Sequence, residues 1–232
     1  MDRYHLLPAE AKRLGIGTSM LEHIGSGYVG LHNDVKNGGN VAWQRYIIGD
    51  YWICGQTCSG GKYYDVDMGK DPLNNPNLNA TVSIVNDSKF LSQYMNYVRL
   101  EAVRIGTTDP SGLDSVAFIN SNGKYVVVVK TSSSNRSFSV AGLPAGTYGI
   151  SYVTNNTVIS TSNWRVNLTD QSISPNGTVS ASTSNDGVVT IYAKTAGSST
   201  PTPTSAQPTP TKSPTPLPPT PTPTPIGDVN GD

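Results

Sequence analysis

The stretch Gly17–Tyr28, GTSMLEHIGSGY, decides the fold of this chain. Apolar residues between Met20 and Ile24 surround a single carboxylate, that of Glu22, and a glycine-rich loop follows. This pattern predicts a short buried strand that delivers one acid to a surface turn. A glutamate in such a place needs a partner or a function, because an unpaired charge is costly to remove from water. Glu22 is therefore either one half of a buried ion pair or a catalytic carboxylate at the carboxyl end of a parallel strand.

The residues around this stretch predict alternating helices and strands. Leu6–Leu14 carries helix-forming residues and ends at a glycine, and the strand of Glu22 follows at once. Asn40 is expected to cap a second helix over Val41–Ile48, and Tyr51–Cys54 is expected to form the next strand. The order helix, strand, helix, strand is typical of parallel α/β architecture. Because two strands cannot complete such a sheet, this part is expected to be the end of a larger α/β domain.

A third helix is predicted over Ser88–Leu100, and from Glu101 the pattern changes to alternation and hairpins. Asn122-Gly123 is a strong hairpin signal, and Val126–Val129 is expected to be a central strand buried on both faces. The spacing predicts an antiparallel β-sandwich over residues 101–196. Its strands are expected at residues 102–105, 114–119, 124–130, 137–140, 146–154, 157–160, 165–168, 177–182 and 188–194.

The composition narrows the class of partner and the compartment. The 16 basic residues balance the 16 acidic ones, so nucleic acid and anionic membranes are not expected as partners. No apolar run approaches the roughly 20 residues of a membrane helix. The glycine- and tyrosine-rich, weakly charged composition is typical of a secreted β protein, although no signal peptide is visible at Met1. Cys54 and Cys58 form either a short disulfide or two ordinary thiols, depending on the compartment.

The C-terminal residues predict a linker and the start of a calcium loop. Residues 197–225 are rich in proline and threonine, a composition that cannot form a core and is expected to be disordered. In residues 226–232, Asp228, Asn230 and Asp232 alternate as the first three ligands of an EF-hand-type loop do. The closing acidic ligand of such a loop is not in this sequence.

Gly227–Asp232, placed after such a linker, resembles the opening of a dockerin. Dockerins are calcium-dependent modules that attach enzymes to the cohesins of cellulosome scaffolds. The resemblance implies a cohesin as partner and calcium as the ion of the complete module.

Leu6–Thr195 resembles the C-terminal end of a clan A glycoside hydrolase of the family 30 type. The resemblance rests on Leu21-Glu22-His23, on Tyr51-Trp52 and on the crossing from helix to sandwich at Tyr97–Gly106. The turn Gly142–Tyr148 is also common in such sandwiches. The resemblance implies a mixed fold: the last strands and helices of a (β/α)8 barrel in residues 1–100, followed by the antiparallel β-sandwich and the linker.

The same resemblance assigns roles to individual residues. Glu22 matches the nucleophile of retaining hydrolysis at the end of the seventh barrel strand, a mechanism that pairs two carboxylates about 5 Å apart. Trp52 would end the eighth strand and either stack on a sugar ring or belong to the core. His23 and Tyr28 would hydrogen-bond sugar hydroxyls. The implied activity is hydrolysis of plant cell-wall polysaccharide without a catalytic cofactor.

The acid/base partner that this chemistry needs is not evident in the sequence. In the family it lies in an Asn-Glu pair on the fourth strand, and the other glutamates here are Glu10 and Glu101, neither of which follows an asparagine. The chain by itself is therefore expected to be inactive. The alternative is a non-catalytic carbohydrate-binding or attachment module, in which aromatic residues of the sandwich would face solvent. The candidates for such a row are Tyr148, Tyr152, Trp164 and Tyr192.

Overall fold

The computed structural model describes residues 10–11, 13–23, 27–45, 47–52, 61–67, 81–132, 136–157, 165–183 and 186–196. These residues all belong to one compact unit, residues 1–200. The expected linker (197–225) and calcium loop (226–232) lie outside the described residues and stay predictions. The part of the chain that is described contains no helix long and apolar enough to cross a membrane.

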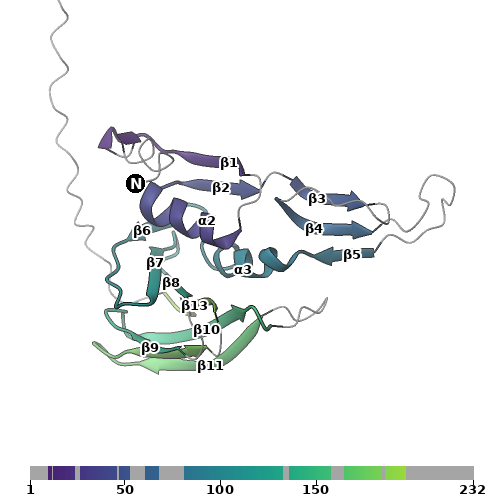
Figure 1. Cartoon of the computed structure of the whole chain (residues 1–232). Coiled ribbons are helices and arrows are strands. Elements are labelled where there is room, and N and C mark those ends of the chain that lie inside the picture. The colour runs from purple at the N-terminus through teal and green to yellow at the C-terminus, as the bar shows by residue number, and fades with distance from the viewer. Residues whose placement is uncertain are drawn as a thin grey trace, which may run out of the picture. The chain divides into compact units, whose positions relative to one another are not determined.

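The C-terminal part of the described chain is a β-sandwich, as the sequence predicts (Figure 1). Its larger sheet has six antiparallel strands in the order β11-β10-β13-β8-β7-β6. The smaller sheet pairs β12 with β9. The strands are β6 (Val103–Ile105), β7 (Leu113–Ile119), β8 (Tyr125–Thr131), β9 (Arg136–Val140), β10 (Gly146–Thr154), β11 (Val166–Ile173), β12 (Val179–Thr183) and β13 (Gly187–Ala193). The strand expected at residues 157–160 is not confirmed: Thr157 lies in no strand and the rest is outside the described residues.

The hairpin between β7 and β8 turns where the Asn-Gly signal predicts. Gly123 has a φ of 76°, in the left-handed region that glycine adopts without strain. Its N–H donates to the carbonyl of Asn120 (2.8 Å), and the N–H of Asn120 donates to the carbonyl of Lys124 (2.9 Å). The turn fixes the register, in which Ile119 faces Tyr125.

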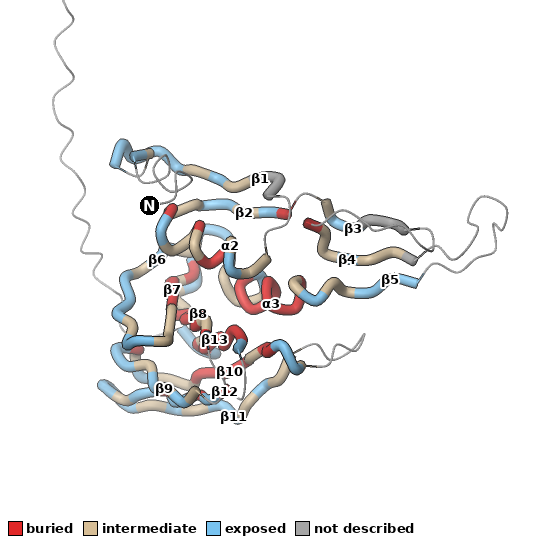
Figure 2. Tube along the Cα trace, viewed as in Figure 1, coloured by how far each residue is buried: buried red, intermediate tan, exposed pale blue. Residues whose placement is uncertain are grey.

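The six-stranded sheet separates two apolar cores. On one face, Val127 and Val129 of β8 pack toward the residues of β9 and β12. On the other face, Val126 and Val128 pack with Phe90 and other residues of helix α3 (Asn86–Met95). The four valines are no more than 5% exposed, so the predicted central strand, buried on both faces, is confirmed. Buried segments of α3 and of the central strands mark the two cores in Figure 2.

The N-terminal part contains a βαβ unit. Strand β1 (Ser19–His23) runs parallel to β2 (Ala42–Arg45), with Ser19 opposite Ala42 and His23 opposite Arg45. Between them lie helix α2 (Tyr28–Asn33) and a five-residue π-helix, η2 (Asp34–Gly38). Gly39, with a φ of 67°, ends the helical segment in the left-handed conformation.

The order helix, strand, helix, strand is therefore found, but two of its members lie elsewhere than predicted. The helix expected over Val41–Ile48 is wrong, because those residues contribute to β2 and to β3 (Ile47–Trp52). The segment VAWQRYII is rich in β-branched and aromatic residues, which favour a strand when a neighbouring strand is available to pair with. The helix of this unit lies earlier, over 28–38, where no helix was expected.

A second small sheet follows, and α3 leads into the sandwich. Strand β3 runs parallel to β4 (Lys62–Asp67), which pairs antiparallel with β5 (Thr81–Ile84). Helix α3 was expected over Ser88–Leu100; it begins two residues earlier and ends five residues earlier. Of the first predicted helix, Glu10, Ala11 and Arg13 are described and are helical.

Candidate functional site

The carboxyl ends of β1 and β2 lie at the same edge of the parallel pair. Glu22 is the penultimate residue of β1, and His23, the last, is opposite Arg45 at the end of β2. In parallel α/β architecture the carboxyl ends of the strands carry the functional groups. The backbone therefore presents Glu22 at the edge where a catalytic carboxylate is expected. The side chains of Glu22 and His23 lie outside what the structure describes.

The other predicted site residues are placed as follows. Trp52 is the last residue of β3, and its side chain is outside the described part. Tyr51 and Trp52 end β3, so the first half of the strand expected over Tyr51–Cys54 is found, and the rest lies outside the described residues. The strand that pairs with β1 is β2. Asp228, Asn230 and Asp232 are not described, and no group of three or more His, Cys, Asp or Glu side chains gathers as metal ligands within the described ranges.

Tyr28 is the first residue of α2, five positions after the end of β1. Its ring stacks on Phe90 of α3 with centroids 4.4 Å apart and an interplanar angle of 19°. Burial raises the pKa of the Tyr28 hydroxyl, and the charges of Asp186 and Asp87 act in the same direction. Tyr28 therefore stays neutral near pH 7 and has one face of its ring covered by the core.

Arg45 is a site candidate that the sequence reasoning missed. Its side chain is buried, and its Nη2 lies 3.6 Å from Oδ2 of Asp87, in the first turn of α3. Its backbone N–H donates to the Tyr63 hydroxyl (3.1 Å). Nε and Nη1 of Arg45 are buried and meet no hydrogen-bond acceptor among the described residues. No local pattern marks Arg45, because its strand, AWQR, is not an apolar run.

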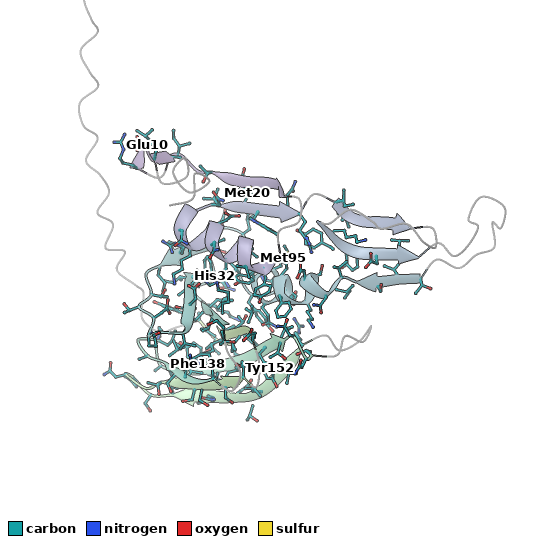
Figure 3. All side chains as sticks on the ribbon, in the orientation of Figure 1. Glu10, Met20, His32, Met95, Phe138 and Tyr152 are labelled. Atoms are coloured by element: carbon teal, nitrogen blue, oxygen red, sulfur yellow. The ribbon has the colours of Figure 1, made fainter. Side chains whose placement is uncertain are left out.

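A buried histidine joins the βαβ unit to the sandwich. His32 of α2 is on the side that faces the six-stranded sheet (Figure 3). Its Nδ1 lies 2.7 Å from the Tyr94 hydroxyl and its Nε2 lies 3.1 Å from Oδ1 of Asp114 on β7. The negative charge of Asp114 favours the proton on the nearby Nε2, and the Tyr94 hydroxyl then donates to Nδ1. Burial lowers the pKa of His32 against the opposing effect of Asp114, so the imidazole is neutral near pH 7.

Asp114 is the centre of a cluster of charges around this histidine. Its carboxylate accepts from Nζ of Lys36 on η2 (2.5 Å) and pairs with Nζ of Lys130 on β8 (3.0 Å). Lys36 also donates to Asp109 (2.8 Å). Burial alone would raise the pKa of Asp114, but the bonds from Lys36 and Lys130 and the nearby His32 hold it well below its ordinary value. The cluster fixes α2 and η2, and thus the helices that follow β1, on the edge of the sandwich.

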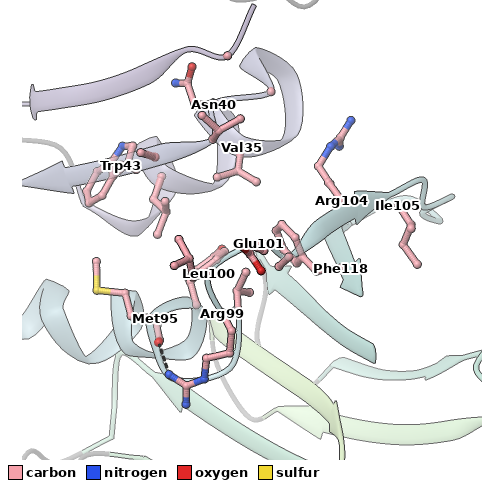
Figure 4. A pocket seen from close by; sticks show the side chains of 18 of the residues that line it. Val35, Asn40, Trp43, Met95, Arg99, Leu100, Glu101, Arg104, Ile105 and Phe118 are labelled. Carbon is pink, nitrogen blue, oxygen red and sulfur yellow. Dashed lines mark hydrogen bonds between the residues drawn. The ribbon is translucent and has the colours of Figure 1, made fainter. Parts of the chain in front are cut away.

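A large groove lies at the opposite end of β1 and β2 from Glu22. Its volume is about 1040 Å³, and residues before the two strands, Gly15–Gly17 and Asn40–Ala42, form one side. Trp43, Met95 and Leu100 line it as well (Figure 4). Trp43 is held there by its Nε1–H, which donates to Oδ2 of Asp34 (2.9 Å). Because this groove is at the amino ends of the strands, it is not the place where Glu22 would act.

The three described aromatic candidates of the sandwich do not form the exposed row that a flat binding face would need. Tyr148 is buried, and its hydroxyl donates to the carbonyl of Pro144 (2.8 Å). Tyr152 is half-buried and packs against the core between the two sheets. Tyr192 stacks on Tyr97 with centroids 4.4 Å apart. The fourth candidate, Trp164, lies outside the described residues.

Comparison with known proteins identifies the sandwich. Residues 101–191 match the model of the glycosyl hydrolase family 30 beta sandwich domain. No curated protein matches the sequence. A structure similar to this one is the catalytic domain of the GH30 xylanase C from Talaromyces cellulolyticus, at 19% identity and a TM-score of 0.51. SrfJ from Salmonella typhimurium is similar at 13% identity and a TM-score of 0.50.

These similarities cover most of this chain but a minority of the other two. The match to the xylanase covers 71% of this chain and 33% of that one, and the match to SrfJ covers 82% and 38%. At such identities the structural matches establish likeness of fold, and the family model establishes the kind of sandwich. The chain therefore carries a sandwich of the glycosyl hydrolase family 30 type and is related to glycoside hydrolases.

Proposed function

We propose that this chain is part of a retaining glycoside hydrolase that cleaves β-glycosidic bonds of plant cell-wall polysaccharide, with Glu22 as its nucleophile. The observation that carries the proposal is the parallel pair β1–β2, which holds Glu22 at its carboxyl edge in a chain that continues into a family 30 sandwich. In this proposal the pair belongs to the end of a (β/α)8 barrel. The chain spans 33% of the length of the similar xylanase domain, which leaves room for the remaining strands.

Arg45 supports the assignment of Glu22. A nucleophilic carboxylate must be ionised, and a nearby positive charge favours the ionised form. Arg45 supplies a buried guanidinium at the end of the strand next to that of Glu22, with two nitrogens that meet no acceptor among the described residues. In the reaction, Glu22 attacks the anomeric carbon while a separate acid/base residue gives its proton to the leaving oxygen. The same residue then takes a proton from water, which releases the sugar from Glu22.

The acid/base residue is proposed to lie outside these 232 residues. Glu10 is exposed and forms an ion pair with Arg13 three residues along the same helical turn. Glu101 is exposed in the turn before β6, with a φ of 65°. Neither is on an element of the parallel pair. The coding sequence upstream of Met1 is therefore expected to carry an Asn-Glu pair on an earlier strand, and an in-frame stop codon directly before Met1 would contradict this.

The test of the nucleophile uses the polypeptide encoded with that upstream sequence and an insoluble xylan or β-glucan as substrate. Glu22→Gln is expected to abolish hydrolysis, whereas the matched control Glu101→Gln keeps it. Azide added to the Glu22→Ala variant is expected to restore turnover and to give the α-glycosyl azide, because the small anion then attacks from the face that Glu22 occupied. Full activity of Glu22→Gln would refute the assignment.

The terminal residues extend the proposal to attachment. We propose that the protein is secreted and that Asp228, Asn230 and Asp232 open the calcium loop of a dockerin that binds a cohesin. The support is the alternation of these ligands after the proline- and threonine-rich segment. A chain extended through the complete loop is expected to bind calcium and to be retained on an immobilised cohesin. Retention that persists after calcium is removed with a chelator would contradict this.

A further inference from the structure

A second pocket lies on the sandwich, away from the carboxyl ends of β1 and β2. Its volume is about 760 Å³, and it is formed by the residues after α3 together with the β7–β8 turn, β11 and the end of β13. Aromatic, amide and charged side chains line it. None of the residues discussed for hydrolysis belongs to it.

Two stacked tyrosines belong to the lining of this pocket. Tyr97 and Tyr192 are both half-buried, and their rings stack with centroids 4.4 Å apart at an angle of 28°. Behind Tyr192, Gly149 of β10 leaves the space that the ring fills, because a Cβ at this position would lie 2.3 Å from Cζ of Tyr192. The Cζ atom of Arg165 lies 5.8 Å from the centroid of the Tyr97 ring. Both tyrosines also pack against the core on this side of the sheet, which holds the pair in place.

Two asparagines shape the base of the pocket. Asn120 accepts at Oδ1 from the backbone N–H of Arg99 (3.0 Å) and donates from Nδ2 to the carbonyl of Tyr97 (2.9 Å). These bonds tie residues 97–99 to the β7–β8 turn. Asn96 also lines the pocket, and its Nδ2 is buried with no acceptor among the residues that the structure describes. A buried amide of this kind is satisfied when a ligand brings an oxygen to it.

The lining of the pocket holds more cations than acids, in a chain whose net charge is zero. Of the charged residues in its lining, Asp170 is the one acid, and it forms an ion pair with Lys194. The cations of the lining are Arg99, Lys124, Arg165 and Lys194. Clustered cations attract anionic ligands, and a guanidinium matches the two oxygens of a carboxylate.

We propose that this pocket binds a carboxylate-bearing saccharide, with a sugar oxygen at the amide of Asn96 and the carboxylate held by Arg99 and Lys124. Amide groups match the hydroxyls of a sugar, and guanidinium and ammonium groups match its carboxylate. The choice of a saccharide over other anions rests on the proposed function. The pocket and its charge do not depend on that function. Such a site would hold an acidic region of the polysaccharide beside the enzyme.

The test measures binding to the full 232-residue chain by calorimetry at low salt. The probes are an oligogalacturonate, a neutral xylo-oligosaccharide of the same length, and inorganic phosphate. The oligogalacturonate is expected to bind, more weakly as salt screens the charges, and roughly tenfold more weakly in Arg99→Gln, which loses one charge-assisted contact. Arg104→Gln, which removes an exposed arginine of β6 outside this pocket, is the matched control and is expected to bind as the unmodified chain does.

Each outcome bears on the proposal. No binding of the oligogalacturonate, or equal loss in Arg104→Gln, would overturn it. If the neutral oligosaccharide binds as tightly as the oligogalacturonate, the charges have no role in binding. If phosphate binds as tightly, the pocket is a general anion site and not a saccharide site. Because binding and not turnover is measured, Glu22→Gln is expected to leave it unchanged. Failure of the proposed hydrolysis is thus distinguishable from failure of this site.

Discussion

Replacing Asp114 by asparagine tests how the βαβ unit is held on the sandwich. The substitution keeps the shape of the side chain and removes the charge that faces Lys36, Lys130 and His32. These three partners come from η2, β8 and α2, so the change weakens the attachment of the segment that follows Glu22. It is expected to lower the free energy of unfolding.

The size of the effect follows from the contacts. A buried hydrogen bond between charged groups contributes about 1.5–3 kcal/mol, and an exposed ion pair about 0.2–1 kcal/mol. The Asp114 side chain is 32% exposed, so solvent screens its contacts with the two lysines. We therefore assign about 1 kcal/mol to each and expect Asp114→Asn to cost about 2 kcal/mol in total.

The assay is urea unfolding followed by circular dichroism at pH 7, with the midpoint compared at an unchanged slope. The matched control is Asp170→Asn, whose carboxylate pairs with an exposed lysine, Lys194, and is expected to change stability by less than about 0.5 kcal/mol. A loss below about 0.5 kcal/mol in Asp114→Asn, or a similar loss in both variants, would refute the reasoning. Acid adds a second check: the low pKa of Asp114 means that its contribution is present above about pH 4 and is lost below it.

Two further predictions concern the core and pH. Leu91→Ala, at a fully buried position of α3, is expected to lower the free energy of unfolding by about 2–5 kcal/mol. The control Leu100→Ala, at a position that is 88% exposed, is expected to change it by less than about 0.5 kcal/mol. Equal urea midpoints for the two variants would show that α3 does not pack on the sheet. His32 has a lowered pKa when folded, so the unfolded chain binds its proton more readily below about pH 6.5, and stability is expected to fall there by at most about 1.4 kcal/mol per pH unit. The His32→Gln variant is expected to show a flatter dependence between pH 7.5 and pH 5.5, and an unchanged slope would contradict the burial of a neutral imidazole.

The sandwich was predictable because its signals are local. Alternation of apolar residues, the Asn122-Gly123 turn and the apolar run Val126–Val129 each act within a few residues, and each is found as expected. The helix α3 was predicted for the same reason, from an apolar face repeated over two to three turns.

The candidate site was less predictable, because its contacts join distant residues. His32 and Tyr94 are 62 positions apart, and Lys36 and Asp114 are 78 positions apart. No pattern in the sequence indicates such pairs. The segment Val41–Ile48 was misassigned because a short apolar run fits a helix or a strand, and pairing with β1 decides between them. Arg45 was missed because its burial, and not its position in the sequence, makes it notable.

The position of β13 has a consequence for the synthesis of the protein. It is the last of the described strands in sequence, yet it lies inside the larger sheet, between β10 and β8. Until Gly187–Ala193 leaves the ribosome, strands β6–β8 and strands β10–β11 cannot join, and each group presents an apolar edge. Closing the sheet brings together residues more than fifty positions apart, as Thr131 and Gly187 are, and such pairing is slow. A nascent chain arrested before β13 is therefore expected to be the species most prone to aggregate and to need a chaperone.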